Sequence, residues 1–332
     1  MLDQGWNYYI DIPLTGPPGG DLYDYTIENI TIPYAEAMTK PDFGDIRFGS
    51  ATKQEEYPYH IVSKSDWVSA TFAVMVPVIR GNSELQYVRC YAGNINATTT
   101  SDPDNTYLFF DDFAVYNDFS RWYSTELGVG DFTEWTINDS ELISSQNGWI
   151  RARLGGSYDN VKLNYKVIAG GSGLSSRVDL ANPNRVEYNS ATLAYRTNEA
   201  GFIKTEEVTS LNQFSLTPYI EYAVEVNKEG ADWILKINGN TVLTLTGWHD
   251  FGVEEVYVQA ENTIQCLFKY LKLTTYTSTP PTLGEIPETW ETEYILTLNL
   301  KGQILYVPPN IPELLGSDQF VVDIGVMRER PT

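Results

Sequence analysis

The segment from Tyr107 to Trp122 constrains the fold more than any other part of the chain. Its 16 residues include seven aromatic side chains and three aspartates. Leaving so much apolar surface in water is unfavourable, so this segment cannot be a free linker. We expect Phe109 to Phe113 to form the first strand of a second domain that lies against the end of the first. The buried structural residues predicted at this junction are Phe109, Phe110, Phe113 and Trp122.

Strand-like alternation of apolar and polar residues extends on both sides of this segment. Upstream, residues 25 to 32 place Thr26, Glu28 and Ile30 on one face, and downstream, residues 161 to 169 alternate in the same way. Asn238-Gly239 is the strongest short hairpin signal in the chain. These patterns predict an all-β protein. The predicted divisions are a domain over residues 1–106, a second domain over 107–277, a Pro-rich linker over 278–290, and a strand-like C-terminal β arm over 291–332.

The first domain carries four signatures in a fixed order. They are Trp6 before a first strand, Asp45-Ile-Arg47-Phe48, the strand Thr71 to Pro77, and Tyr87 to Asn94. This series resembles a small β-domain of unknown function that is found in archaeal and bacterial surface proteins, often ahead of a laminin-G-like module. The resemblance implies a small β-sandwich. Within it, Asp45 and Arg47 form the prominent polar pair, for which a structural ion pair or turn anchor is the common role and ligand binding by Arg47 the alternative.

The second domain resembles a concanavalin-like, laminin-G-type jelly roll. The resemblance lies in the Phe110-Asp111-Asp112-Phe113 opening, the Trp122 that follows, the hairpin at Asn238-Gly239, and the closing strand Phe268 to Leu273. Modules of this type often hold a calcium ion near a sheet rim, so Asp111, Asp112 and Asp118 are candidate metal ligands, with turn or capping roles as the alternative. No other cofactor is expected.

Two further sets of residues raise the question of carbohydrate chemistry. Trp248 and His249 form a candidate ligand-binding pair, although a tryptophan of a β-sandwich is more often buried than used for stacking on sugars. Hydrolases with this fold carry a strand of the pattern Glu-x-Asp-x-(x)-Glu, which is absent here. Glu221 and Glu225 lie on one face of a strand without a third acid in phase, so we expect no catalytic residues.

The charge balance limits the partners of the chain. Forty-four acidic residues against 22 basic ones give a net charge of −22, which argues against binding to nucleic acid. No apolar run approaches the length of a membrane span, about 18 residues or more. The first nine residues contain neither a basic stretch nor an apolar core, so no secretory signal is expected in this numbering.

These observations lead to a predicted function without catalysis. We expect a structural or adhesive protein, a virion subunit of the tail, spike or capsid-decoration type, located in the virion or on an extracellular surface. Its predicted partners are further copies or other structural proteins, bound by addition of the C-terminal arm to a neighbouring sheet, and a cell-surface glycan. The alternatives are a carbohydrate-binding cell-surface adhesin or appendage subunit and, less favoured, a glycan-cleaving enzyme.

Overall fold

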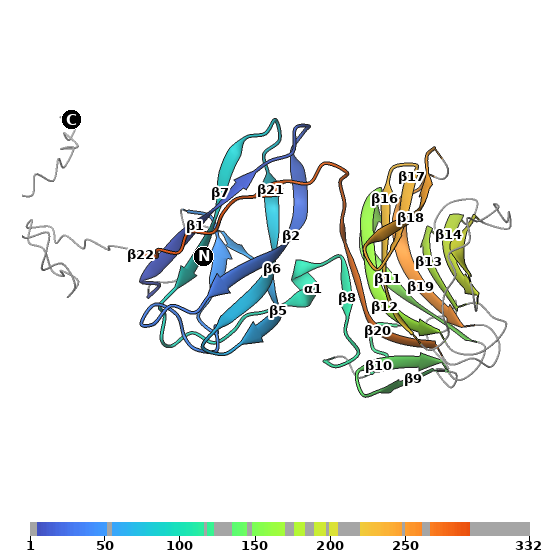
Figure 1. Ribbon diagram of the computed structural model, residues 1–332, viewed down its shortest axis with the longest axis horizontal. Coiled ribbons are helices and arrows are strands. Elements are labelled where there is room, and N and C mark those ends of the chain that lie inside the picture. Colours follow the sequence, from blue (N-terminus) through green and yellow to red (C-terminus); the bar gives the residue numbers. More distant parts are fainter. Residues whose placement is uncertain are drawn as a thin grey trace, which may run out of the picture.

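The protein is built almost entirely of β-strands, in two domains that lie side by side (Figure 1). The computed structural model describes residues 5–51, 55–115, 118–122, 135–144, 148–169, 176–182, 189–196, 199–204, 220–247, 250–260 and 266–292. The predicted fold class, a small β-sandwich followed by a jelly roll, is confirmed. Almost all of the predicted C-terminal arm, residues 293–332, lies outside the described residues.

The first domain is a sandwich of two antiparallel sheets around one core. The larger sheet, in the order β21-β1-β7-β3-β4 with β22 also paired to β1, consists of β1 (Tyr8–Thr15), β3 (Arg47–Gly49), β4 (Glu56–Tyr57), β7 (Leu85–Ala92), β21 (Thr282–Leu283) and β22 (Glu291–Thr292). The smaller sheet consists of β2 (Leu22–Pro33), β6 (Ser69–Ile79) and β5 (Tyr59–Ser65). Residues that alternate along β1, namely Ile10, Ile12 and Leu14, are buried in the core between the sheets.

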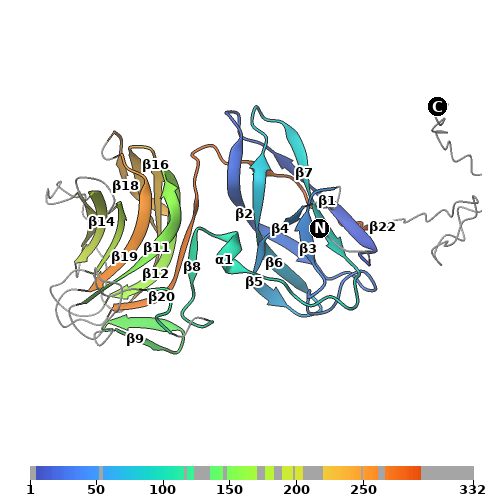
Figure 2. The ribbon, with the colours of Figure 1, turned by 180° about the vertical axis from the view of Figure 1, so that it is seen from behind.

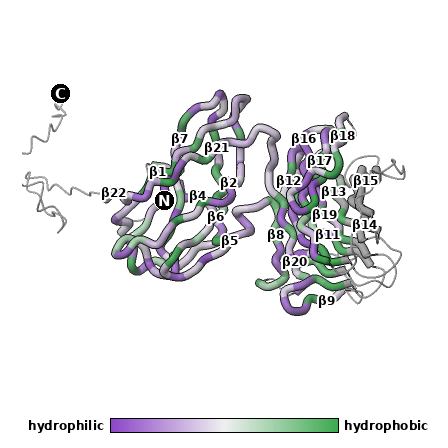
Figure 3. The backbone as a smooth tube through the Cα atoms, viewed as in Figure 1, coloured by the Kyte–Doolittle hydropathy of each residue, from purple (hydrophilic) through white to green (hydrophobic). Residues whose placement is uncertain are grey.

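The second domain is a jelly roll of two larger antiparallel sheets. Its first sheet consists of β18 (Asn240–Leu245), β17 (Asp232–Ile237), β16 (Glu221–Glu229), β12 (Asn160–Ala169), β20 (Cys266–Thr275), β10 (Glu141–Ser144) and β9 (Trp135–Asn138), with β8 (Phe109–Asp111) also paired to β20. Its second sheet consists of β11 (Gly148–Tyr158), β19 (Val253–Ala260), β13 (Ser176–Asn182), β14 (Asn189–Arg196) and β15 (Glu199–Lys204). Apolar and polar residues alternate along the strands of both domains (Figure 3), as the sequence pattern predicts.

After the jelly roll the chain returns to the first domain. Residues 278–290 appear in the sequence as a linker, but in the structure this segment runs along the first domain and adds two short strands to it (Figures 1 and 2). β21 and β22 both pair with β1, and Trp290 is buried in the core of the first domain. The strands pair because β1 has a second edge whose backbone groups need partners. The first domain is therefore completed by residues from both sides of the jelly roll.

The two domains meet through a short helix, β8 and an ion-pair cluster. Helix α1 (Pro103–Thr106) precedes β8, and the Thr26 hydroxyl of β2 donates to the Thr106 carbonyl oxygen at 2.7 Å. Glu28 of β2 accepts hydrogen bonds from Lys162 of β12 and Lys272 of β20. Since these three charged side chains are largely withdrawn from solvent, the ion pairs connect the first domain directly to the first sheet of the jelly roll.

Candidate functional site

A large irregularity between β11 and β19 creates a pocket on the second sheet of the jelly roll. Arg153 pairs with Glu255, but the next pair along the ladder is Tyr158 with Val253. Between these two pairs, β11 has four residues, 154–157, and β19 has one, Glu254. Residues 154–157 therefore bulge out of the ladder. Bulges of this kind redirect side chains and often lie beside functional sites.

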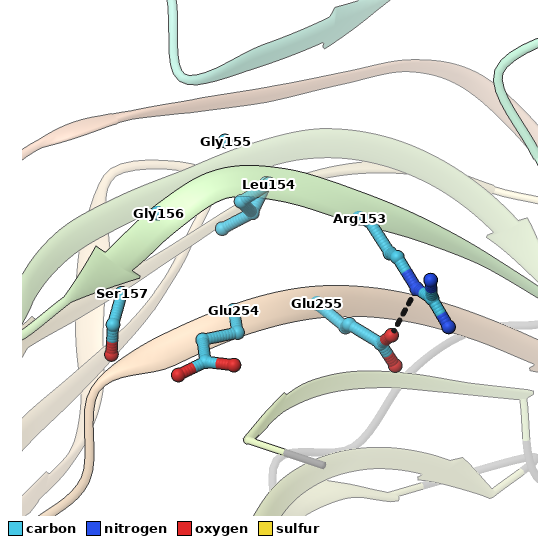
Figure 4. Close-up of a pocket in the computed structure, with 7 residues that line it drawn as sticks. All are labelled: Arg153, Leu154, Gly155, Gly156, Ser157, Glu254 and Glu255. Carbon is cyan, nitrogen blue, oxygen red and sulfur yellow. Dashed lines mark hydrogen bonds and ion pairs between the residues drawn. The ribbon is translucent and has the colours of Figure 1, made fainter. Parts of the chain in front are cut away.

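The pocket has a volume of about 420 Å³. It is lined by Arg153, Leu154, Gly155, Gly156, Ser157, Glu254 and Glu255 (Figure 4). A Cβ atom added at Gly155 would meet no other atom within 4 Å, so this part of the bulge is open. The two glycines leave the backbone uncovered, and the pocket is bordered by one guanidinium group, two carboxylates and one hydroxyl.

Glu255 is the centre of a buried polar network on this sheet. It is 1% exposed and lies on the face opposite the core, into which its neighbours Val256 and Val258 point. Its Oε1 accepts a hydrogen bond from Arg153 Nε at 3.0 Å, and its Oε2 accepts one from the Tyr257 hydroxyl at 2.6 Å. Arg151 Nη1 lies 3.5 Å from the same Oε2 and is itself buried. A buried carboxylate needs such donors, because its desolvation is otherwise costly.

The network fixes Arg153 while leaving much of it accessible. Glu255 holds the Nε of Arg153, yet 60% of the Arg153 side chain remains exposed at the pocket. A guanidinium group is a rigid plane, so the bond from its Nε to Glu255 fixes the orientation of the whole group. Glu254 and Ser157 lie on the other side of the pocket and add acceptors and a hydroxyl (Figure 4).

The three aspartates considered as calcium ligands each anchor a separate turn. Asp111 accepts hydrogen bonds from the Phe113 N–H at 2.8 Å and from the Trp122 indole at 2.7 Å. Asp112 accepts from the N–H groups of Ala114 and Val115, and Asp118 from the N–H of Ser120. Among the described residues, no three His, Cys, Asp or Glu side chains are grouped in a way that could hold a metal ion. Calcium binding by these aspartates stays a prediction.

Burial changes the proton affinity of one of these aspartates. Asp111 is fully buried, and the loss of hydration raises the pKa of its carboxyl to about 6. The hydrogen bonds from Trp122 and Phe113 act in the opposite direction but do not cancel the effect of burial.

Asp45 and Arg47 are both buried and hold loops of the first domain. The Asp45 carboxylate accepts from the N–H groups of Lys40 and Gly93, each at 2.9 Å. Arg47 donates to the carbonyl oxygens of Ile46 at 2.7 Å and Thr98 at 2.6 Å, and its Nε lies 3.2 Å from a carboxylate oxygen of Glu56. Each residue thus binds its own partners.

Three other sets of residues were singled out in the sequence: the junction aromatics, the Trp248–His249 pair, and the acids Glu221 and Glu225. Phe109, Phe113 and Trp122 belong to the core of the jelly roll, whereas Phe110 packs with Ala73 and Tyr107. Trp248 and His249 lie outside the described residues. The acids considered for catalysis form ion pairs, Glu221 with Lys166 and Lys269, and Glu225 with Lys236.

The residues of the β11–β19 pocket do not stand out in the sequence. Arg153 and Glu255 are 102 residues apart, and neither belongs to a motif. The available signals were the alternation of Arg151 and Arg153 with apolar residues and the two consecutive glycines in a strand, which often mark a bulge. Neither signal tells which strand lies opposite.

A family model for a domain of unknown function, DUF2341, matches residues 42–125, about a quarter of the chain. This match supports the resemblance of the first domain to a β-domain of unknown function. A search of curated proteins finds no match.

Solved structures similar to this chain include two enzymes and a protein of unknown function. One is a sialidase, with 11% identity and a TM-score of 0.40, covering 60% of this chain and 21% of the other. Another is a Bacillus licheniformis β-glucanase, with 10% identity and a TM-score of 0.41, covering 51% and 98%. A third is a Bacillus subtilis protein of unknown function with a galectin-like fold, with 10% identity and a TM-score of 0.41, covering 51% and 96%. The chain spans about a fifth of the sialidase.

These comparisons correct the predicted function. The expectation of a virion structural subunit is not supported, because the matched structures include a sialidase, a glucanase and glycosyl hydrolases. They agree better with the alternatives, a carbohydrate-binding adhesin or appendage subunit and a glycan-cleaving enzyme, which stay predictions. Within the described residues there is no helix of the length and apolar character that a membrane crossing requires.

Proposed function

We propose that this protein binds carbohydrate through the pocket between β11 and β19 of its jelly roll. The observation that carries the proposal is the position of Arg153, which lines the pocket and is held by the buried Glu255 while 60% of its side chain is exposed. The proposed location is an extracellular surface, where a glycan ligand is encountered.

The groups that line the pocket suit the hydroxyl groups of a sugar. Neighbouring hydroxyls can accept from the guanidinium group of Arg153 and donate to the carboxylate of Glu254, as in any charge-assisted hydrogen bond. Gly155 and Gly156 allow a ring to approach the backbone, and Leu154 contributes apolar surface. A volume of about 420 Å³ lies within the range of small-ligand pockets, roughly 300–1,000 Å³.

The proposed activity is binding of the glycan without its cleavage. A glycoside hydrolase needs one carboxyl group to donate a proton and a second to attack or to activate water. Glu255 is surrounded by Arg151, Arg153 and the Tyr257 hydroxyl, which occupy both of its oxygens. The other acid of the pocket is Glu254, and the described lining residues include no third carboxylate.

Arg153→Gln tests the binding site. We expect glycan binding, measured on a glycan array and then by calorimetry with the best ligand, to weaken at least tenfold, because hydrogen bonds from a charged group contribute about 1.5–3 kcal/mol. Lys166→Gln is the matched control, since Lys166 is a partly exposed cation of the other sheet that pairs with Glu221. Equal binding by both variants and the unchanged protein would rule out this pocket.

A separate assay addresses cleavage. The unchanged protein and Glu254→Gln are incubated with the polysaccharides that bind, and newly formed reducing ends are measured. We expect none from either protein. Release of reducing ends that disappears in Glu254→Gln would show that the pocket is catalytic.

A further inference from the structure

A second pocket lies between the two domains, away from the β11–β19 pocket. Its volume is about 510 Å³. Its lining comes from β5, from the segment that leads into α1, and from β8 with the turn after it: His60, Thr100, Ser101, Asp102, Pro103, Phe110, Asp112 and Val115. In Figures 1 and 2, α1 and the end of β5 lie opposite β8. We call this space the junction pocket.

An aromatic cluster forms one wall of the junction pocket. The rings of Phe110 and Tyr107 are stacked with centroids 5.3 Å apart, and the His60 ring lies 5.0 Å from that of Phe110. Phe110 is 8% exposed and also packs against Ala73. Val115, by contrast, is 71% exposed at the rim. The pocket therefore offers a fixed aromatic surface inside and a further apolar side chain at its opening.

Two carboxylates of the junction pocket are held in place by neighbouring N–H groups. Asp112 Oδ1 accepts from the backbone of Ala114 at 3.0 Å and Val115 at 2.9 Å. Asp102 accepts from the backbone of Asp104 and Asn105 at the start of α1. Because backbone N–H groups hold both carboxylates, we expect both to contribute negative charge to the pocket.

His60 does not offset this negative charge. Burial lowers the pKa of its imidazole below the ordinary 6.5, although Asp112 acts in the opposite direction, so the ring is neutral at neutral pH. Its Nδ1 lies 3.1 Å from the hydroxyl of Tyr107. Among the residues that the structure describes, the lining of this pocket contains no Lys or Arg. Lys272, whose Nζ lies 5.6 Å from the Tyr107 ring centroid, pairs with Glu28, and Arg121 pairs with Asp104.

We propose that the junction pocket binds an amino sugar residue, with its ammonium group next to Asp112 and its apolar ring face against Phe110. A sugar has one face of C–H groups that packs on an aromatic ring, and hydroxyls that bond to groups such as Ser101 and His60. The negative lining favours a cationic substituent and disfavours an acidic one. This site is independent of the carbohydrate binding proposed for the β11–β19 pocket.

The full chain is titrated with glucosamine, glucose and glucuronate at a pH where the amine is charged. Binding is followed by calorimetry and by the imidazole NMR signal of His60, one of only two histidines in the chain. We expect glucosamine to bind most tightly and to shift the His60 signal, and glucuronate not to bind. Equal affinity for all three sugars, or glucosamine binding without a shift of the His60 signal, would overturn the proposal.

Asp112→Asn and Asp118→Asn form the matched pair of variants. Both aspartates accept backbone N–H groups through Oδ1 in turns of the same segment, and asparagine keeps that acceptor, but only Asp112 lines the pocket. We expect Asp112→Asn to weaken glucosamine binding at least tenfold. Asp118→Asn and Arg153→Gln should bind glucosamine as the unchanged protein does. Equal loss in Asp112→Asn and Asp118→Asn, or loss in Arg153→Gln, would contradict the assignment to the junction pocket.

Discussion

Phe109 and Phe110 are consecutive in β8 but pack into different domains. Phe109 contacts Trp122 in the core of the jelly roll, with ring centroids 5.2 Å apart, whereas Phe110 packs with Ala73 of the first domain. Successive side chains of a strand point to opposite sides, so one short strand serves both domains. The aromatic density at the junction follows from this double use.

Truncation of the junction aromatics should have unequal effects. Phe113→Ala removes a ring that is 1% exposed in the large core, and we expect it to lower the free energy of unfolding by about 3–5 kcal/mol. Phe110→Ala should cost less, because Phe110 packs in a small cluster, which among the described residues consists of Ala73, Tyr107 and the His60 ring, rather than in the large core. Urea unfolding followed by tryptophan fluorescence measures both. Equal losses would show that Phe110 is as deeply integrated as Phe113.

The Glu28 ion pairs should make the coupling of the domains sensitive to acid. Burial raises the pKa of Glu28, but Lys162 and Lys272 outweigh it and hold the pKa below the ordinary 4.5. A lowered pKa means that the stabilisation is present above pH 4.5 and is lost as the pH falls through the folded-state pKa. We expect Glu28→Gln to cost about 1.5–3 kcal/mol at neutral pH and to flatten the pH dependence of unfolding below 4.5.

Glu225→Gln is the control for Glu28→Gln. Among the described residues, Glu225 pairs with Lys236 and accepts hydrogen bonds from Asn164 and Asn227, all of them inside the jelly roll. Calorimetric unfolding and small-angle scattering distinguish the two variants. Only Glu28→Gln should broaden the distribution of domain arrangements. The same broadening in Glu225→Gln would mean that the Glu28 ion pairs do not set the arrangement.

Asp111 should give the opposite dependence on pH. Its pKa is raised to about 6, so the folded state binds the proton more tightly than the unfolded chain. The contribution is fully present below pH 3.8 and is lost as the pH rises through about 6. Its size is on the order of 3 kcal/mol, at 1.36 kcal/mol per pKa unit. Carbon NMR of the Asp111 carboxyl tests this directly, and titration in the range of an exposed aspartate would contradict it.

Trp290 should stabilise the first domain although it follows the jelly roll in the sequence. It is 7% exposed and belongs to the core between the two sheets of the first domain. We expect Trp290→Ala to lower the free energy of unfolding of that domain by about 3–5 kcal/mol, as for other buried aromatics. Hydrogen exchange can assign the loss to β1 and β7 rather than to the jelly roll. Unchanged exchange in these two strands would show that the returning segment is only loosely attached.

The sequence predicts those features of the fold that depend on local patterns. Alternation in segments such as residues 161–169 indicates strands, and the aromatic residues after Tyr107 indicate a junction, because both signals lie within a few neighbouring residues. The return of the chain to the first domain has no such signal. Leu14 pairs with Leu283, and the two are separated by the whole jelly roll. The prolines of this segment suggested a linker, but they interrupt β-structure without preventing two short edge strands.

The candidate sites were harder to predict because they, too, depend on contacts between residues that are far apart in the sequence. The β11–β19 pocket depends on a bulge, and a bulge is a property of two paired strands rather than of one sequence segment. The junction pocket combines His60 of the first domain with Asp112 of the second. The sequence pointed to Asp112 as an acidic residue near the junction, but not to the imidazole that shares its pocket.

The return of the chain also determines how tension would travel through the molecule. The jelly roll enters through β8 and leaves through β20, and these strands pair with each other, Phe109 opposite Leu273. At the other end of the molecule, Tyr8 of β1 lies opposite Thr292 of β22. A pull on the chain before Tyr8 and after Thr292 would therefore separate β1 from β22 one pair at a time. The jelly roll lies outside the path of that force, so the β11–β19 pocket can keep its shape while the first domain is under load.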